Sequence, residues 1–506
     1  MKKTIARLLS ILCVLVTVFA VPLTASAAGE GNYTYTFNYW GEIQESPDAY
    51  AVDVVLDYHD LGLDKPIRHP QGLFVKDDII YVVDTDNNRI VVLERKDHTV
   101  RLLRTINQIY GTELNTFNKP MDVYVDSEDN MYIADNQNYR IVMVDKNLNF
   151  IKEFTKPDDP TFDQENAFMP LKLVADAAGR IYTQVTNGNK GIMKFENDTT
   201  FTGYIGAAEV VYSTYEYIWR FFQTQAQRNR SEQFVPTEYE NICIDKDGFM
   251  YVVTSKFEEA DLRGGKAKPI RRLNTMGSDI LIRNGYEDPI GDVYWGDGGG
   301  YNGPSYFTDV TALENNMYAV LDKNRGKVFT YDSQGNLLYA FGGNGNIDGF
   351  FRQPTAIEHQ GRDILVIDAL DGCLTIFTPT EYGNLVYEAT DIYLKGNYDL
   401  SAELWEQVLA INGNYDLAYV GIGRSQLRES DYQNAMKNFK LKYEREHYSK
   451  AFQLFRKEWV EDNIIWIVVV LVILIAVPLI SDTIKKTKWE VRRYEYDEQC
   501  RKNSQR

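Results

Sequence analysis

Short stretches in which apolar and polar residues alternate recur through most of the chain, with turn-forming residues between them. Residues 118–154 show the pattern clearly, because four such stretches follow one another there, at 118–126, 130–135, 139–144 and 150–154. Alternation with a period of two is typical of a strand that buries one face. The pattern therefore predicts a unit of four short strands.

This unit recurs along the chain, and each copy begins near a proline. The starts are separated by 50, 50, 66, 68 and 50 residues, at Pro70, Pro120, Pro170, Pro236, Pro304 and Pro354. A four-stranded unit with this period is typical of a propeller blade. We therefore expect a mainly β fold, a six-bladed β-propeller over residues 33–381, with insertions in the two longest intervals.

The last unit, residues 355–377, lacks a fourth strand before the pattern becomes helical. Residues 33–41 resemble the fourth strands expected at 201–206 and 337–342. An open ring would leave unpaired sheet edges. We therefore expect the N-terminal strand, residues 33–40, to complete the sixth blade and close the ring.

From about residue 382 the spacing of apolar residues changes to 3.6, which is typical of helices. One motif occurs twice, 34 residues apart, as Tyr398, Ser401 and Trp405 and then as Tyr432, Ala435 and Phe439. This region resembles two tetratricopeptide repeats, in which small residues let paired helices approach closely. We expect helical repeats over residues 382–460. Two repeats bury little core alone, so they should pack on the propeller or on a partner.

Two apolar segments indicate the topology. Residues 1–27 combine three bases, an apolar run and Ala25-Ser26-Ala27, as in a cleaved export signal. Residues 464–480 carry no charge and would span roughly 26 Å as a helix, slightly less than a hydrocarbon core, and Trp466 and the lysines after the segment can anchor it as a transmembrane helix. Bases dominate the tail, residues 481–506, which the positive-inside rule places in the cytoplasm. We expect a single-pass protein of the cell membrane with an extracytoplasmic propeller.

The charge balance excludes one class of partner. The chain has 506 residues, with 54 Lys and Arg against 72 Asp and Glu. Both terminal segments are basic, so the part between them is more acidic than the total suggests, which argues against nucleic-acid binding. The two cysteines of that part, Cys243 and Cys373, each lie in an apolar stretch. Buried thiols are favoured there, although an extracytoplasmic location also permits a disulfide.

The repeats resemble the NHL family, in which a proline and an alternating strand precede Tyr-Val-Ala-Asp and then Asn-x-Arg-Ile. The second unit matches almost throughout, at Pro120, Val123, Val125, Asp126, Tyr132, Ala134, Asp135, Asn138, Arg140 and Ile141. The first matches at Pro70, Tyr81, Asp84, Asn87, Arg89 and Ile90. The resemblance covers residues 33–378 and implies a propeller. It weakens where Val185 and Thr254 replace the aspartate and where Lys190 and Lys327 replace the arginine.

The pairs Asp84/Arg89 and Asp135/Arg140 admit two interpretations. They could form carboxylate–guanidinium binding sites. Their repetition at the same position of each blade favours a pair that organises the turn between two strands.

The two longer intervals supply candidate binding residues. Residues 209–232 have helical spacing and predict an amphipathic helix that covers the ring or contacts a partner. Exposed aromatic residues are typical of interfaces, so the partner-binding candidates are Trp219 and Phe222 of this interval, together with Trp405 of the helical repeats. The second interval places aromatic residues on a glycine-rich backbone beside acidic residues. That composition suits stacking on sugar rings, or a loop that packs on the blade, and its ligand-binding candidates are Tyr294, Trp295, Asp297 and Tyr301.

Evidence for catalysis is sparse. The five histidines lack metal-ligand spacing, and no Gly-x-Ser-x-Gly motif occurs. We therefore predict no cofactor, with calcium left open. The leading hypothesis is a bacterial, membrane-anchored binding or scaffold protein of the cell envelope. It would bind proteins, glycans being a further option, as an accessory to a transporter or polysaccharide system. The alternative is a metal-dependent propeller hydrolase or lyase acting on sugars or lactones.

Overall fold

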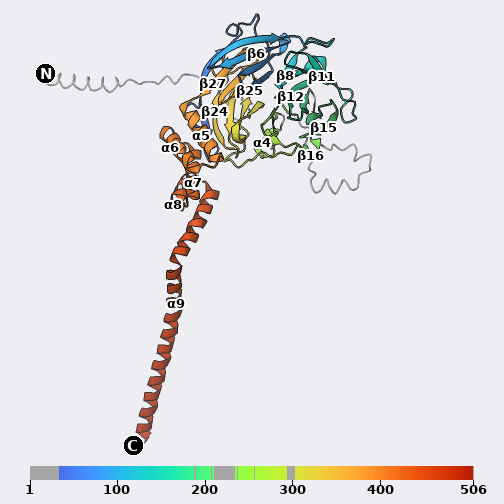
Figure 1. Ribbon diagram of the computed structural model, residues 1–506. Coiled ribbons are helices and arrows are strands. Elements are labelled where there is room, and N and C mark those ends of the chain that lie inside the picture. Colours follow the sequence, from blue (N-terminus) through green and yellow to red (C-terminus); the bar gives the residue numbers. More distant parts are fainter. Residues whose placement is uncertain are drawn as a thin grey trace, which may run out of the picture. The chain divides into compact units, whose positions relative to one another are not determined.

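The computed structural model describes residues 34–186, 188, 190–206, 208–209, 234–235, 238–255, 257–292 and 303–504. Two compact units divide the chain, Met1–Leu417 and Ala418–Arg506. The first contains the strands and the first helices, and the second contains the remaining helices (Figure 1). The predicted export signal, residues 1–27, lies outside the described residues.

Six antiparallel sheets form the blades of a β-propeller, as the repeat predicted. The first three blades have four strands each, and their strands follow one another along the chain. Blade one contains β4 (Gly72–Lys76), β5 (Ile79–Asp84), β6 (Arg89–Lys96) and β7 (Thr99–Ile106); blade two contains β8 (Pro120–Val125), β9 (Met131–Asp135), β10 (Arg140–Val144) and β11 (Phe150–Phe154); blade three contains β12 (Pro170–Ala175), β13 (Ile181–Val185), β14 (Ile192–Phe195) and β15 (Phe201–Ile205).

The other three blades are less regular, because one has three strands and two include strands from the N-terminal part. Blade four contains β18 (Asn241–Ile244), β19 (Met250–Val253) and β20 (Ile270–Leu273); blade five contains β21 (Phe307–Ala312), β22 (Tyr318–Asp322), β23 (Lys327–Tyr331) and β24 (Leu337–Gly342), extended by β1 (Tyr35–Phe37) and β2 (Ile43–Glu45); blade six contains β25 (Pro354–Gln360), β26 (Asp363–Asp368), β27 (Cys373–Pro379) and β3 (Tyr50–Leu56). Short elements complete the unit: β16 (Ala208–Glu209), β17 (Phe234–Val235), α4 (Glu259–Arg263), η1 (Thr85–Asn87), η2 (Asn136–Asn138) and η3 (Glu314–Asn316).

The apolar core lies between neighbouring blades rather than at the centre of the ring. One cluster joins Leu73 and Ile80 of blade one to Leu365 and Ile376 of blade six, and all four side chains are buried. The first strands of successive blades, β4, β8, β12, β18, β21 and β25, contact one another in that order around the ring. Each blade therefore buries both faces of its alternating strands.

A strand from the N-terminal part closes the ring, but it is not the predicted one. β3 pairs with β27 and supplies the fourth strand of blade six. The predicted segment, residues 33–40, instead contributes β1, which pairs with β24 at the outer edge of blade five. Both segments alternate apolar and polar residues. β3 has seven residues where β1 has three, so β3 can pair with β27 from Leu374 to Pro379.

The two ends of the strands define two faces of the propeller. At one end, which we call the turn face, every connection between paired strands is two to five residues long. At the other end, the loop face, the turns between second and third strands bond to the connections that enter the blades. Such bonds run from Gln137 N to Asn118 O (3.0 Å) and from Ala369 N to Gln353 O (2.9 Å). All the long connections between blades reach this loop face.

The helices begin at the turn face, since β27 ends there. The first pair is α5 (Glu381–Leu394) and α6 (Tyr398–Ile411), and α7 (Asp416–Arg428) follows. On the turn face, Arg362 Nη1 donates to Glu388 Oε1 of α5 (3.0 Å). The hydroxyl of Tyr415 donates to Leu338 O of blade five (2.8 Å). α5 and the segment between α6 and α7 thus pack on the propeller.

A glycine makes this packing possible. A Cβ at position 383 would lie 2.0 Å from the carbonyl oxygen of Ala49, just before the closing strand. We expect Gly383→Ala to lower the free energy of unfolding by about 1–3 kcal/mol, as overpacking does in cores. Urea denaturation of the purified chain measures this. Gly413→Ala is the control, because the nearest atom there is 3.8 Å away; an equal effect of both variants would contradict the expectation.

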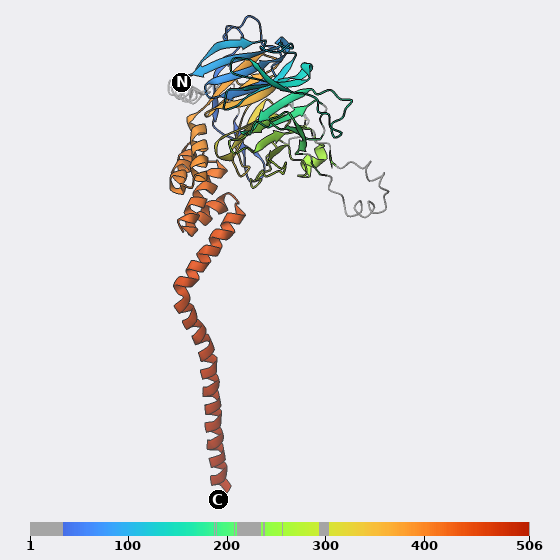
Figure 2. The ribbon, with the colours of Figure 1, turned by 45° about the vertical axis from the view of Figure 1, so that its right-hand side comes forward.

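The second unit contains the rest of α7, α8 (Tyr432–Leu441) and α9 (Arg445–Ser504). Tyr398 and Tyr432 begin α6 and α8, so the 34-residue motif marks equivalent helix starts. α9 is the long helix at the end of the chain (Figure 2), and no other described part of the protein buries its apolar segment, residues 464–480. Among the described residues, α9 is the one helix long and apolar enough to cross a membrane.

Candidate functional site

The central channel of the propeller contains a cavity of about 160 Å³. Residues from all six first strands line it, because each of these strands bonds to a neighbour on one side only. Its apolar walls include Phe74 and Tyr124. Its polar side chains are Asp122, Asn241, Asp309, Thr311, Glu358 and His359.

One polar layer arises from equivalent positions of the first strands. Each member pairs with the residue at the same place in its second strand: Gly72 with Val83, Asp122 with Ala134, Lys172 with Gln184, Asn241 with Val253, Asp309 with Leu321 and Ala356 with Ile367. The layer thus mixes two carboxylates, an amine and an amide with two small residues. We call these six residues the channel layer.

The carboxylates of the channel layer connect neighbouring blades. Asp122 Oδ2 accepts a hydrogen bond from the backbone N–H of Leu173 in blade three (2.9 Å). Asp309 Oδ2 accepts one from Ile357 N in blade six (2.7 Å), and its Oδ1 accepts one from the amide of Asn241. These bonds satisfy first-strand N–H groups that would otherwise face the channel, so both carboxylates have a structural role.

Lys172 is the cation of this layer. Its ammonium donates to Gln71 O in blade one (2.6 Å) and its charge lowers the pKa of both Asp122 and Asp309. Burial outweighs that effect. It raises the pKa of Asp122 and raises the pKa of Asp309 to about 7.

Glu358 lies two residues beyond the layer position of blade six, and its side chain is 18% exposed. Burial, followed by the charge of Asp309, raises the pKa of Glu358 to about 8. The channel therefore holds carboxyl groups that bind protons near neutral pH.

A hydroxyl connects Glu358 to a histidine. Thr311 Oγ1 lies 3.0 Å from Glu358 Oε2 and 2.7 Å from His359 Nδ1. Burial lowers the pKa of His359, which favours the neutral imidazole. A hydroxyl has one proton to donate. If Thr311 donates it to one of these partners, the other must donate to Thr311, so the protonation of Glu358 is coupled to the tautomer of the neutral His359.

The described residues contain neither a metal-binding cluster nor a reactive thiol in the channel. No group of three His, Cys, Asp or Glu side chains that could hold a metal ion occurs within them. Burial and the charge of Glu358 raise the pKa of the Cys243 thiol well above its ordinary value. A protonated thiol is a poor nucleophile. Cys243 and Cys373 are both unbonded.

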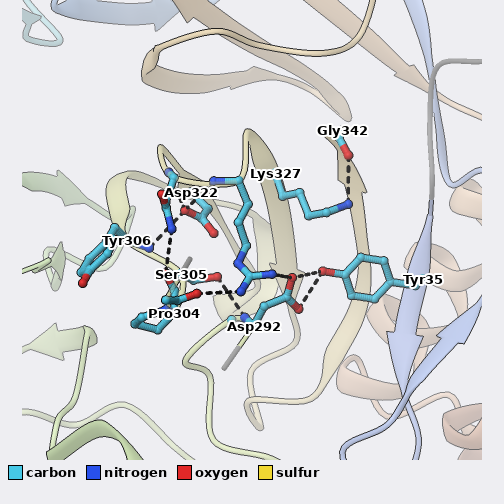
Figure 3. A network of polar contacts seen from close by, with 12 residues as sticks. Tyr35, Asp292, Pro304, Ser305, Tyr306, Asp322, Lys327 and Gly342 are labelled. Carbon is cyan, nitrogen blue, oxygen red and sulfur yellow. Dashed lines mark hydrogen bonds and ion pairs between the residues drawn. The ribbon is translucent and has the colours of Figure 1, made fainter. Parts of the chain in front are cut away.

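A second polar network holds β1 against blade five (Figure 3). The Tyr35 hydroxyl donates to the Asp292 carboxylate (2.8 and 2.7 Å), and Arg325 Nη1 lies 3.3 Å from Asp292 Oδ2. Lys327 Nζ donates to Gly342 O (3.0 Å), and burial lowers the pKa of Lys327 to about 8. Asp292 thereby fixes the start of the connection that contains residues 293–302.

The pairs Asp84/Arg89 and Asp135/Arg140 organise turns, as predicted. Arg89 Nε lies 2.6 Å from Asp84 Oδ2, and Arg140 Nε lies 3.0 Å from Asp135 Oδ2. Each aspartate also accepts a backbone N–H from the connection that enters its blade: Asp84 from Arg68 (2.8 Å) and Asp135 from Asn118 (2.8 Å). With its arginine at most 4% exposed, each pair lies inside the blade.

Most of the predicted site residues lie outside the described residues. They are Tyr294, Trp295, Asp297 and Tyr301 in one segment and Trp219 and Phe222, with the predicted amphipathic helix, in the other. Trp405 is described. It is 4% exposed and stacks on Tyr415, just before α7, with the ring centroids 5.9 Å apart. Its part in partner binding stays a prediction, and the structure gives it a packing role.

A pocket at the edge of blade three has a composition that suits polar ligands. Its volume is about 340 Å³, within the range of roughly 300–1,000 Å³ usual for ligand sites. The residues that line it include Phe162, Asp163, Asn166, Lys190 and Tyr204. The channel cavity is smaller than this range.

Sequence reasoning did not identify the channel residues. Asp122 and Lys172 each stand two positions after the proline that begins a blade. The sequence did contain a signal for these residues, namely a polar residue at the same position of successive repeats.

The sequence matches no protein-family model and no curated protein. Several solved propellers are similar in structure. Virginiamycin B lyase from Staphylococcus aureus is 13% identical with a TM-score of 0.37, covering 65% of this chain and 99% of its own. An auxiliary nutrient binding protein from Bacteroides thetaiotaomicron is 13% identical with a TM-score of 0.39, covering 69% and 77%. The gluconolactonase XC5397 from Xanthomonas campestris is 11% identical with a TM-score of 0.35, covering 62% and 85%. Structural similarity at this level of sequence identity and TM-score says nothing about the activity of this chain.

Proposed function

We propose that this protein is a membrane-anchored binding protein of the cell envelope. In this proposal an NHL-type propeller lies outside the cell and presents its loop face to partner proteins or glycans. Tetratricopeptide-like helices join it to the single membrane span, and the basic tail is cytoplasmic. An accessory role beside a transporter or a polysaccharide system would use such an arrangement.

The observation that carries the proposal is the difference between the two faces. The connections between paired strands at the turn face are short, and α5 and Tyr415 contact this face. The loop face receives the long connections between blades, including those that contain residues 210–233 and 293–302; the second of these starts at the turn face, where Asn284 N donates to Gln334 O (2.7 Å). Gly303, where the second of these segments ends, bonds to Arg325 in a loop-face turn (2.8 Å). In repeat folds, insertions on one face often mark the binding surface.

Two polar groups of the channel already serve the fold. Asp122 and Asp309 are used in bonds between blades, and the described residues contain no group that could hold a metal. A metal-dependent site would have to draw on the segments outside them.

The aromatic segment provides a direct test. We expect the double variant Trp295→Ala and Tyr301→Ala to weaken binding at least about tenfold, since large aromatic side chains dominate binding energy. The measurement is binding of the detergent-purified chain to a glycan panel and photo-crosslinking to membrane proteins in cells. Trp40→Ala is the matched control, because Trp40 is 60% exposed in the hairpin that extends toward the turn face. Unchanged crosslinks and glycan binding in the double variant would exclude this segment as the binding site.

One observation favours the alternative function, a hydrolase or lyase. Glu358 is a carboxyl group in a cavity with a pKa of about 8, as a general acid requires. Turnover of sugars or lactones that Glu358→Gln abolishes would establish this alternative over the binding proposal.

A further inference from the structure

Between residues 485 and 498 the charges of α9 fall into two sectors. With 3.6 residues per turn, Lys485, Lys486, Lys488, Arg492 and Arg493 fall in one sector together with Trp489 and Tyr496. The acidic residues of the same stretch, Glu490, Glu495, Asp497 and Glu498, fall in the other. We call the first sector the basic–aromatic face.

This face lacks partners within the described part of the chain. No acidic side chain there pairs with Lys485, Lys486, Lys488 or Arg492, and Arg493 lies over the ring of Trp489 at 5.3 Å. By contrast Lys502, outside the face, pairs with Glu498 at 2.8 Å. Trp489 and Tyr496 are 61% and 66% exposed. Five cations and two aromatic rings are thus available to an anionic surface.

The face begins directly after the apolar segment. Lys485 follows Ile480 by five residues, about 7.5 Å along a helix, which is within one Debye length of a membrane surface. Anionic headgroups attract bases at this distance, and aromatic side chains prefer the same interface. An anionic lipid surface would also repel the acidic sector and so orient the helix.

The helix can bend where the apolar segment ends. Pro478 lies inside α9, and a proline cannot donate the helical hydrogen bond. Thr483 Oγ1 donates to Leu479 O (2.8 Å) and Thr487 Oγ1 donates to Thr483 O (2.9 Å). Such bonds from threonine to the preceding turn often bend helices. A bend here would let the following turns lie along the membrane instead of projecting from it.

We propose that residues 485–496 lie on the membrane surface and bind anionic phospholipid headgroups through the basic–aromatic face. The proposal rests on the membrane anchoring in the proposed function. It adds a lipid preference and an orientation that anchoring alone does not require.

Two exposed tyrosines on different sectors test the orientation. Tyr496 lies in the basic–aromatic face and Tyr494 in the other, and they are 66% and 75% exposed. Each is replaced by cysteine in a chain whose own Cys13, Cys243, Cys373 and Cys500 are serines, and a fluorophore is attached. The full chain is placed in nanodiscs of phosphatidylcholine with brominated acyl chains, with or without about 30 mol % phosphatidylglycerol.

With phosphatidylglycerol, we expect lipid quenching at position 496 to exceed that at 494 by at least about twofold, and without it the difference should disappear. Replacing the five bases by glutamine should also remove the difference. Arg501→Gln with Lys502→Gln, outside the face, should leave it intact.

Equal quenching at both positions in anionic nanodiscs would overturn the proposal, as would a difference that survives the loss of the five bases. Failure of the chain to enter nanodiscs at all would instead contradict membrane anchoring. The two failures are therefore distinguishable.

Discussion

Replacing Arg140 by methionine should lower the free energy of unfolding by about 3–5 kcal/mol, the usual cost of removing one partner from a buried ion pair. Arg140 is 2% exposed and Asp135 is fully buried. The guanidinium lies 3.0 Å from Asp135 Oδ2 and also donates to Leu114 O (2.8 Å). Without it, Asp135 would keep its backbone and amide donors but lose its neutralising charge.

Urea denaturation of the purified chain gives this quantity. Arg101→Met is the control, since Arg101 pairs with Glu94 while 68% exposed, and exposed pairs contribute only about 0–1 kcal/mol. The loss of stability in Arg140→Lys should lie between the losses in the two methionine variants. A lysine occupies the equivalent position of blade five, where Lys327 bonds to Gly342 O. A loss below about 1 kcal/mol in the methionine variant would contradict a buried, turn-organising pair.

Stability should fall as pH rises from about 4 to 8, and Glu358→Gln should reduce this fall. The pKa values of Asp309 and Glu358 in the folded protein are about 7 and about 8. Their unfolded values are roughly 4. Between these limits the folded state binds more protons than the unfolded state, so raising the pH favours unfolding. The contribution is fully present below about pH 4 and is lost above about pH 8, with a magnitude on the order of 2–4 kcal/mol.

Glutamine at position 358 removes one of these titrations and the repulsion of Asp309. We therefore expect the variant to be more stable than the parent at pH 8.5, by about 1–2 kcal/mol, and similar at pH 5. Urea midpoints across this pH range provide the measurement. Glu406→Gln, an exposed position on α6, should retain the parent's profile. A Glu358→Gln profile that parallels the parent would show that this carboxyl does not titrate as inferred.

The extent to which each feature could be predicted depends on how local its cause is. Asp135 and Arg140 are five residues apart in a recurring turn, so their pairing follows from the repeat itself. The prolines similarly set the register of every first strand. The 34-residue helical motif gave the equivalent starts of α6 and α8 for the same reason.

Other features depend on contacts distant in sequence. Apolar and polar residues alternate in both N-terminal segments, β1 and β3. β3 closes the ring because its length, Tyr50–Leu56, matches that of β27, and β1 pairs with blade five instead. The channel residues are single polar positions in apolar strands. Their meaning appears when the ring brings Asp122 to Leu173, or Asp309 to Ile357.

The closing strand has a consequence for how the chain is made. Leu56 of β3 pairs with Leu374 of β27, 318 residues further along. At roughly 5–20 residues per second, the ribosome needs about 15–65 s to produce the second strand after the first. Throughout that interval the nascent chain carries an unsatisfied strand edge, which can pair with another copy or be shielded by a chaperone. The yield of folded protein should therefore depend on the rate of translation. This dependence should be stronger than for a protein whose strands pair only with neighbours in the sequence.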